Sequence, residues 1–158
     1  MAGSLLSPWR LKPGNWAGAF ACWGLENREA AIRLIAATQG TPHGASVEVK
    51  IIDGSANPYL SAAAVLGLAL HGVTHRLPLP DEVPVNPTEL PESERSAMAL
   101  AADQSTALDA LDRSALARRL LGDLIVDGTL AVRRYEQRTY GSAEPDEVAD
   151  AFRLAFSG

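Results

Sequence analysis

The sequence predicts an α+β protein, with part of an antiparallel sheet in residues 1–56 and a mainly helical half in residues 57–158. Glycine and proline punctuate the first part, and apolar and polar residues alternate within it, as they do in strands. The second part carries helix-start residues that are followed by apolar residues at helical spacing. A chain of 158 residues fits a single domain of this kind.

Three strands are expected in the first part, over residues 17–23, 30–35 and 47–51. The first is small and aromatic, and the second is mostly aliphatic. In the third, valine and isoleucine face one side while Glu48 and Lys50 face the other. This alternation is typical of a strand with one polar face.

The second part predicts helices over residues 59–70, 105–121, 124–140 and from 145 onward. The first follows an Asn-Pro start and is apolar on every side, so it is expected to be buried, with Gly72 ending it. Residues 76–92 are rich in proline and acidic groups, which indicates an ordered surface loop.

Composition and charge exclude several functions. The net charge of −5 and the pI near 5.1 give no basic footprint for nucleic acid. No apolar run approaches the roughly 20 residues that span a membrane, and no segment resembles a targeting signal. The single cysteine, Cys22, cannot form an internal disulfide. A cytoplasmic protein is therefore expected.

Glu48 and Lys50 are the first candidate site residues. Two positions apart on a strand, they share a face at a separation of about 7 Å. A carboxylate can bind a hard divalent cation, and a lysine can bind an anionic substrate or a phosphate. A solvated surface ion pair is the alternative. The chain has only two lysines against twelve arginines, which favours a specific role for Lys50.

Three arginines are further candidates. Arg28 and Arg33 flank a stretch of small residues, and their planar guanidinium groups could bind phosphoryl oxygens. Arg10 precedes a Pro-Gly turn and could reach a carboxylate from a mobile loop. Ordinary surface arginines and an ordinary turn are the alternatives.

Three motifs occur in a fixed order along the chain. Residues 7–14 read SPWRLKPG, residues 26–33 read ENREAAIR, and residues 47–60 contain VEVK followed by DGSANPYL. Residues 120–123 and 132–136 add two helical segments. Together they resemble the C-terminal part of the glutamine synthetase catalytic domain, in order and spacing, over nearly the whole chain.

This resemblance implies an ATP-dependent ligase that phosphorylates the γ-carboxylate of glutamate and then forms an amide with ammonia or another amine. It implies that Glu48 is a ligand of a catalytic Mg²⁺ or Mn²⁺, and that Arg10, Arg28 and Lys50 bind glutamate. Arg28 and Lys50 are the expected catalytic residues, and Arg28 with Arg33 is expected to bind nucleotide phosphates. Full-length members are expected to form homo-oligomeric rings.

The chain also departs from the family pattern. The family's N-terminal part, which carries most carboxylate ligands, a histidine ligand and a glycine-rich nucleotide loop, does not occur in it. We therefore expect the isolated chain to be inactive, with an unpaired sheet edge. A non-catalytic remnant is one alternative.

Two further departures concern single residues. Trp16 stands where many ammonia-using members have a glutamate, so a γ-glutamyl-polyamine or γ-glutamyl-ethanolamine ligase is an alternative to a glutamine synthetase. Thr88 stands where some bacterial members carry an adenylylated tyrosine, so that control is expected to be absent.

Overall fold

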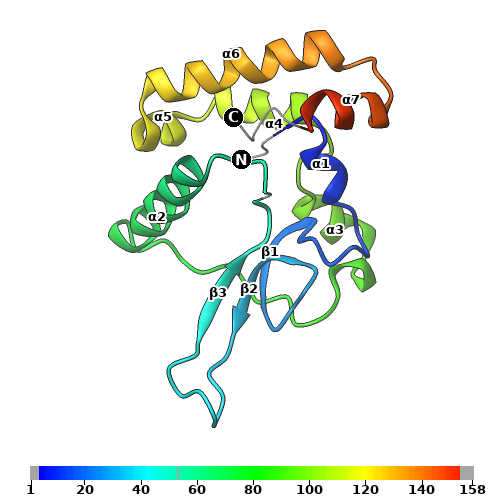
Figure 1. Ribbon diagram of the computed structural model, residues 1–158. Coiled ribbons are helices and arrows are strands. Elements are labelled where there is room, and N and C mark those ends of the chain that lie inside the picture. The colour runs from blue at the N-terminus through cyan, green and yellow to red at the C-terminus, as the bar shows by residue number, and fades with distance from the viewer. Residues whose placement is uncertain (1–3, 53, 154–158) are drawn as a thin grey trace. The chain divides into compact units, whose positions relative to one another are not determined.

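The computed structural model describes residues 4–52 and 54–153 (Figure 1). Its residues form two compact units. The strand unit comprises residues 9–52 and 78–102, and the helical unit comprises the described residues of 1–8, 53–77 and 103–158. A short helix, α1 (Ser7–Arg10), opens the chain. None of the described helices is both long and apolar enough to cross a bilayer.

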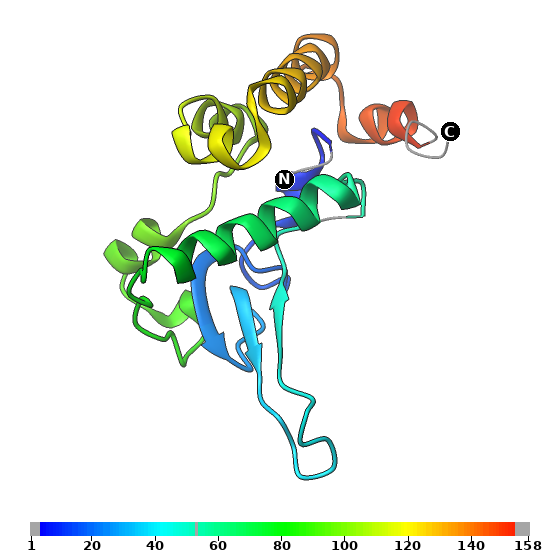
Figure 2. The same ribbon diagram turned by 90° about the vertical axis from the view of Figure 1, so that its left-hand side faces the viewer.

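The strand unit is built on a three-stranded sheet with the order β1-β2-β3. The strands are β1 (Phe20–Leu25), β2 (Ala30–Ile35) and β3 (Ser46–Val49). The α+β class and three strands are confirmed. The sheet is mixed, however, because β2 pairs antiparallel with β3 but parallel with β1. Figure 2 shows β1 and β2 running in the same direction.

The connection between β1 and β2 is unusually short for parallel strands, a pairing that the sequence did not predict. Parallel neighbours usually need a crossover of a dozen residues or more, but only four residues join β1 to β2. Asn27 stabilises this connection. Its Oδ1 accepts hydrogen bonds from the backbone N–H groups of Glu29 (3.0 Å) and Ala30 (3.3 Å). Its Nδ2 donates to the carbonyl oxygens of Val83 (2.8 Å) and Val85 (2.9 Å).

Residues 78–102 lie along the outer edge of β1. The backbone N–H of Val83 donates to the carbonyl of Trp23 at 3.0 Å, and Phe20 forms an antiparallel bridge with Ala99. This segment contains a 3₁₀ turn, η1 (Pro87–Glu89), within the predicted loop, and a helix, α3 (Glu92–Met98), that the sequence analysis missed. Phe20, Ala30 and Ala31 are buried in this unit.

The helical unit contains five helices within its described residues: α2 (Pro58–Thr74), α4 (Gln104–Asp112), α5 (Ala115–Leu121), α6 (Asp123–Tyr140) and α7 (Pro145–Phe152). The predictions for α6 and α7 are confirmed. The predicted helix over 105–121 is two helices, because Ser114 caps a new one by accepting from the N–H of Ala117 at 3.1 Å. Leu108, Val126 and Leu130 form the core of this unit.

Helix α2 begins as predicted but differs from the prediction in its end and its burial. Asn57 caps it by accepting from the N–H groups of Tyr59 (3.0 Å) and Leu60 (3.1 Å). Gly72 does not end it, because a helix interior tolerates glycine at a cost of only about 1 kcal/mol. Figure 2 shows it in green as one unbroken helix.

The expectation that α2 is buried is wrong for the described chain. Leu66 is 69% exposed and Val73 is 76% exposed, and Ser61 and Ala64 are the buried residues of this helix. The apolar residues of α2 lie all around the helix, but within the helical unit α2 packs mainly against α5. One neighbouring helix can cover only one face of another.

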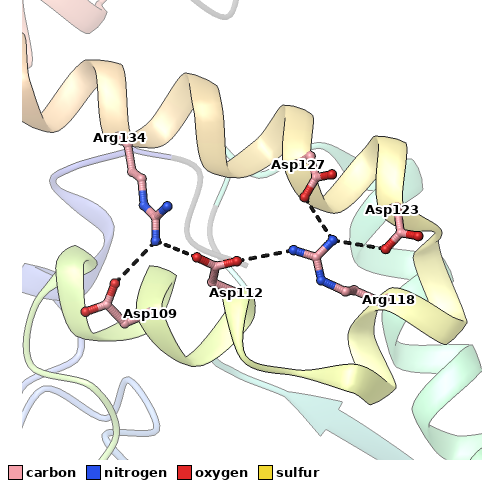
Figure 3. A network of polar contacts seen from close by, with 6 residues as sticks. All are labelled: Asp109, Asp112, Arg118, Asp123, Asp127 and Arg134. Atoms are coloured by element: carbon pink, nitrogen blue, oxygen red, sulfur yellow. Dashed lines mark hydrogen bonds and ion pairs between the residues drawn. The ribbon is translucent and has the colours of Figure 1, made fainter.

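Ion pairs join α4, α5 and α6 (Figure 3). Arg118 of α5 lies 3.2 Å from the Oδ1 of Asp112, 3.0 Å from Asp123 and 2.9 Å from Asp127. Arg134 of α6 donates to the other oxygen of Asp112 at 2.8 Å. The carboxylate of Asp112 therefore links two guanidinium groups. These interactions hold the pKa of Asp112 below its ordinary range, with Arg134 as the largest cause, and raise that of Arg118.

We predict that Asp112 contributes to the acid sensitivity of the fold. A carboxyl group with a lowered folded-state pKa stabilises the protein above its unfolded-state pKa, near 3.8, and this contribution is lost as the pH falls through the folded-state pKa. The urea midpoint of the wild type should therefore fall more steeply below about pH 4 than that of Asp112→Asn. Asp81→Asn, at a position with no ion pair within the described chain, serves as the control. Parallel curves for Asp112→Asn and wild type would contradict the prediction.

Candidate functional site

The pairing of β2 with β3 places Arg33 and Glu48 directly opposite each other. Residues that face each other across a sheet present their side chains on the same side, and Arg33 Nη1 lies 3.6 Å from Glu48 Oε2. Arg33 also pairs with Glu26, which follows β1. Glu26 is the main cause of a raised pKa for Arg33, and Arg33 in turn lowers the pKa of the Glu26 carboxyl.

Lys50 extends this charged face by one position beyond β3. Its backbone N–H donates to the carbonyl of Ala31 at 2.9 Å, so the ladder continues through it. Its Nζ lies 3.9 Å from Glu48 Oε2, and its side chain is only 12% exposed. The predicted shared face for Glu48 and Lys50 is thus confirmed, and the two form an ion pair. The half-exposed carboxylate of Glu48 lies between Arg33 and Lys50, and it can exchange one of these cationic partners for another cation.

Arg10 reaches the end of β3 from the N-terminal segment. Its Nη2 donates to the carbonyl oxygens of Lys50 (3.1 Å) and Ile52 (3.3 Å). These bonds fix the guanidinium group beside Lys50 through the main chain. Four of the five candidate side chains, from Arg10, Arg33, Glu48 and Lys50, therefore gather around β3.

Arg28 lies instead beside the Pro-Gly loop, with no ion pair to Glu48 within the described chain. Its guanidinium carbon is 5.4 Å from the centre of the Trp16 ring, within the range of a cation–π interaction. Trp16 has a positive φ of 49°, and its N–H donates at 2.9 Å to Oε1 of Glu29. Glu29 is 3% exposed, and its Oε2 has no hydrogen-bond partner among the residues that the structure describes. This buried carboxylate anchors the loop, a role that the sequence analysis did not assign.

Glu48 provides the type of ligand that a divalent cation prefers, but it does not provide enough ligands to bind one alone. Mg²⁺ and Mn²⁺ prefer oxygen ligands and take about six of them, of which one carboxylate supplies one or two. Among the described residues, no three His, Cys, Asp or Glu side chains are grouped closely enough to bind a metal ion. This face can contribute one ligand to a metal site that needs others.

Gly18 holds the loop against both strands of the site. It has a φ of +76°, and a Cβ atom there would lie 2.9 Å from the Lys50 Cβ and 3.0 Å from the Ala31 Cα. Only glycine allows this approach without displacing the backbone. The sequence does not distinguish Gly18 from the other glycines, because the close approach of the loop to the strands arises from tertiary packing.

We predict that Gly18→Ala destabilises the chain by about 1–3 kcal/mol, through strain at positive φ and overpacking against β2. The urea unfolding midpoint measures this loss. Gly14→Ala is the matched control, since Gly14 also has a positive φ but a Cβ there would meet no atom within 4 Å. Equal losses for the two variants would contradict the packing argument.

Comparison with known proteins assigns the chain to a family. Residues 2–149 match the family "Glutamine synthetase, catalytic domain". The chain is 36% identical to a γ-glutamylpolyamine synthetase of Streptomyces coelicolor, over 98% of this chain and 34% of that protein. It is 34% identical to a glutamine synthetase of Mycolicibacterium smegmatis, over 84% of this chain and 30% of that protein.

A solved structure agrees with these sequence relatives. The crystal structure of a novel glutamine synthase homolog matches 96% of this chain and 33% of that chain, with a TM-score of 0.75 and 31% identity. The chain thus spans about a third of the length of the relatives it matches. It belongs to the glutamine synthetase catalytic-domain family and corresponds to part of that domain.

Proposed function

We propose that this chain is the C-terminal portion of the catalytic domain of an ATP-dependent glutamate–amine ligase. The observation that carries the proposal is the gathering of Arg33, Glu48, Lys50 and Arg10 around one strand in a member of this family. The complete site needs further ligands for the metal and the nucleotide. The chain alone is therefore inactive under this proposal.

In the proposed reaction, a γ-carboxylate oxygen of glutamate attacks the γ-phosphorus of ATP and ADP leaves. The amine nitrogen then attacks the acyl carbon, phosphate leaves with the bonding electrons, and the nitrogen loses a proton. Both steps develop negative charge on phosphoryl oxygens. Lys50 is suited to stabilise that charge because its side chain is largely shielded from water.

The arginines bind the anionic groups of the two substrates, glutamate and ATP. Arg10 and Arg28 bind the carboxylate groups of glutamate, for which their forked N–H donors are well matched. Arg28 and Arg33 bind nucleotide phosphates. Glu48 acts as a metal ligand once it leaves Arg33 and Lys50. Mg²⁺ or Mn²⁺, when bound, would neutralise charge on the transferring phosphoryl group.

Trp16 supports a second candidate, a ligase that uses a polyamine or ethanolamine. Trp16 is 61% exposed on a loop fixed by Glu29, and its indole ring already contacts one cation, the guanidinium group of Arg28. An alkylammonium substrate could use the same type of interaction. The relative from S. coelicolor is a γ-glutamylpolyamine synthetase, which adds weight to this candidate.

Complementation tests the proposed site. The 158-residue chain, mixed with the N-terminal two-thirds of the S. coelicolor relative, should bind Mn²⁺ and release phosphate from ATP in the presence of glutamate and an amine. Glu48→Gln should weaken Mn²⁺ binding in the mixture by roughly tenfold or more, since a direct ligand is lost. Electron paramagnetic resonance measures the free Mn²⁺.

Glu92→Gln is the control, because the partners of Glu92 within residues 4–52 and 54–153 are the neighbouring Arg95 and Ser96, at the surface of the unit that also holds Glu48. Equal Mn²⁺ binding by the wild type and both variants would contradict the role of Glu48. A mixture that binds neither Mn²⁺ nor ATP would favour the non-catalytic remnant. Robust turnover by the chain alone would refute the need for a second part.

A second prediction concerns the amine. In the complemented enzyme, Trp16→Glu should lower kcat/KM for a polyamine relative to ammonia by a factor of about two to five, the worth of an exposed cation–π interaction. Steady-state assays with putrescine and with ammonium chloride measure the ratio. Trp9→Glu changes the same residue type outside the loop and should leave the ratio unchanged. An unaltered ratio in Trp16→Glu would exclude Trp16 from amine selection.

A further inference from the structure

Glu26 directly follows β1, and hydrogen bonds from both its main chain and its side chain hold it against β2. Its backbone N–H donates to the carbonyl of Leu34 at 2.8 Å, and its Oε1 accepts from the N–H of Ala36 at 3.3 Å. Its Oε2 accepts a hydrogen bond from Nη2 of Arg33. Glu26 also has a φ of 54°, which is uncommon for a residue other than glycine. The bonds to β2 therefore fix the carboxylate as well as the main chain of this residue.

Arg33 lies between two carboxylates that hold it unequally. Its Nη2 is hydrogen-bonded to Glu26, whereas its Nη1 lies 3.6 Å from Glu48, an ion-pair distance that is too long for a hydrogen bond. The side chain of Arg33 is only 18% exposed. Among the residues that the structure describes, Glu26 is thus the hydrogen-bond acceptor of this guanidinium group, and Nη1 keeps its donors for another acceptor.

The unequal arrangement matters when Glu48 changes its partner. A metal ion that binds Glu48 takes this carboxylate away from Arg33. An arginine with no second partner would then lose its fixed rotamer, and ordering it again would weaken the binding of the next ligand. Arg33 instead keeps Glu26 on its Nη2 side. Its Nη1 side then stays open to a phosphoryl oxygen, which takes the place of Glu48.

We propose that Glu26 is a positioning residue, which holds the guanidinium group of Arg33 in place while Glu48 leaves it for a metal ion. Arg33 is thereby ordered in advance for a nucleotide phosphate. Glu26 acts through Arg33 and touches no substrate itself. This role rests on the proposed function, in which Arg33 binds nucleotide phosphates and Glu48 binds the metal.

The first test uses the chain alone. In the ¹⁵N-labelled 158-residue chain, NMR at low temperature should show separate Nη signals for Arg33, because Glu26 slows the rotation of the guanidinium group. Glu26→Gln keeps an acceptor for Ala36 but removes the charge, so these signals should merge. Glu48→Gln should leave them separate. Separate signals in Glu26→Gln, or merged signals in Glu48→Gln, would overturn the proposal. If Glu26→Gln fails to fold, Glu48→Gln decides alone.

The second test uses the mixture with the N-terminal two-thirds of the S. coelicolor relative. Glu26→Gln should raise the dissociation constant of ATP about two- to tenfold, which is the effect of ordering one long side chain on binding. Loss of a negative charge would by itself strengthen the binding of an anion, so weaker binding identifies positioning. Glu92→Gln removes another carboxylate–arginine pair of the strand unit and should not weaken ATP binding. Unchanged or tighter ATP binding by Glu26→Gln would overturn the proposal.

Failure of the proposed function gives a different result from failure of the positioning role. If the proposed function is wrong, the wild-type mixture binds no ATP, while the Arg33 signals of the chain alone still depend on Glu26. That result would overturn both proposals. If only the positioning role is wrong, the wild type and Glu26→Gln bind ATP with equal affinity.

Discussion

The antiparallel pairing of β2 with β3 is the constraint on which the site depends. Because a register shift of one residue moves every side chain to the other face, only the observed register sets Arg33 opposite Glu48 and leaves Lys50 on the same side. The main chain of Lys50 and Ile52 then receives Arg10. One ladder thus assembles a carboxylate and three cations from segments 40 residues apart in the chain.

The two units are stabilised by different interactions. In the strand unit, side chains that bind the backbone, above all Asn27 and Glu29, fix the connections between strands. In the helical unit, a small apolar core is supplemented by the ion pairs around Asp112 and Arg118. The exposed apolar surface of α2 and the lack of three metal-ligating side chains grouped among the described residues agree with the proposal that this domain functions with further polypeptide.

Local signals predicted much of the fold. Asn57 predicted the start of α2, and Pro145 predicted the start of α7. Both signals can be read from the sequence because capping depends on neighbouring residues alone. Tertiary effects produced the errors. The break at Ser114 was hidden by leucines that continue at helical spacing, and the parallel pairing of β1 depends on bonds from Asn27 to residues more than 50 positions away. Alternation predicted the shared face of Glu48 and Lys50 but gave no sign that Gly18 packs against it.

The position of a bound metal ion tests the central claim most directly. Crystals of the chain in complex with a completing N-terminal part, grown with Mn²⁺ and an ATP analogue, would locate the ion by anomalous scattering. The account predicts a peak at a coordination distance of about 2.0–2.2 Å from a Glu48 oxygen, with Arg33 turned from Glu48 to phosphate oxygens. A metal peak remote from Glu48, with the Arg33–Glu48–Lys50 ion pairs intact, would contradict it.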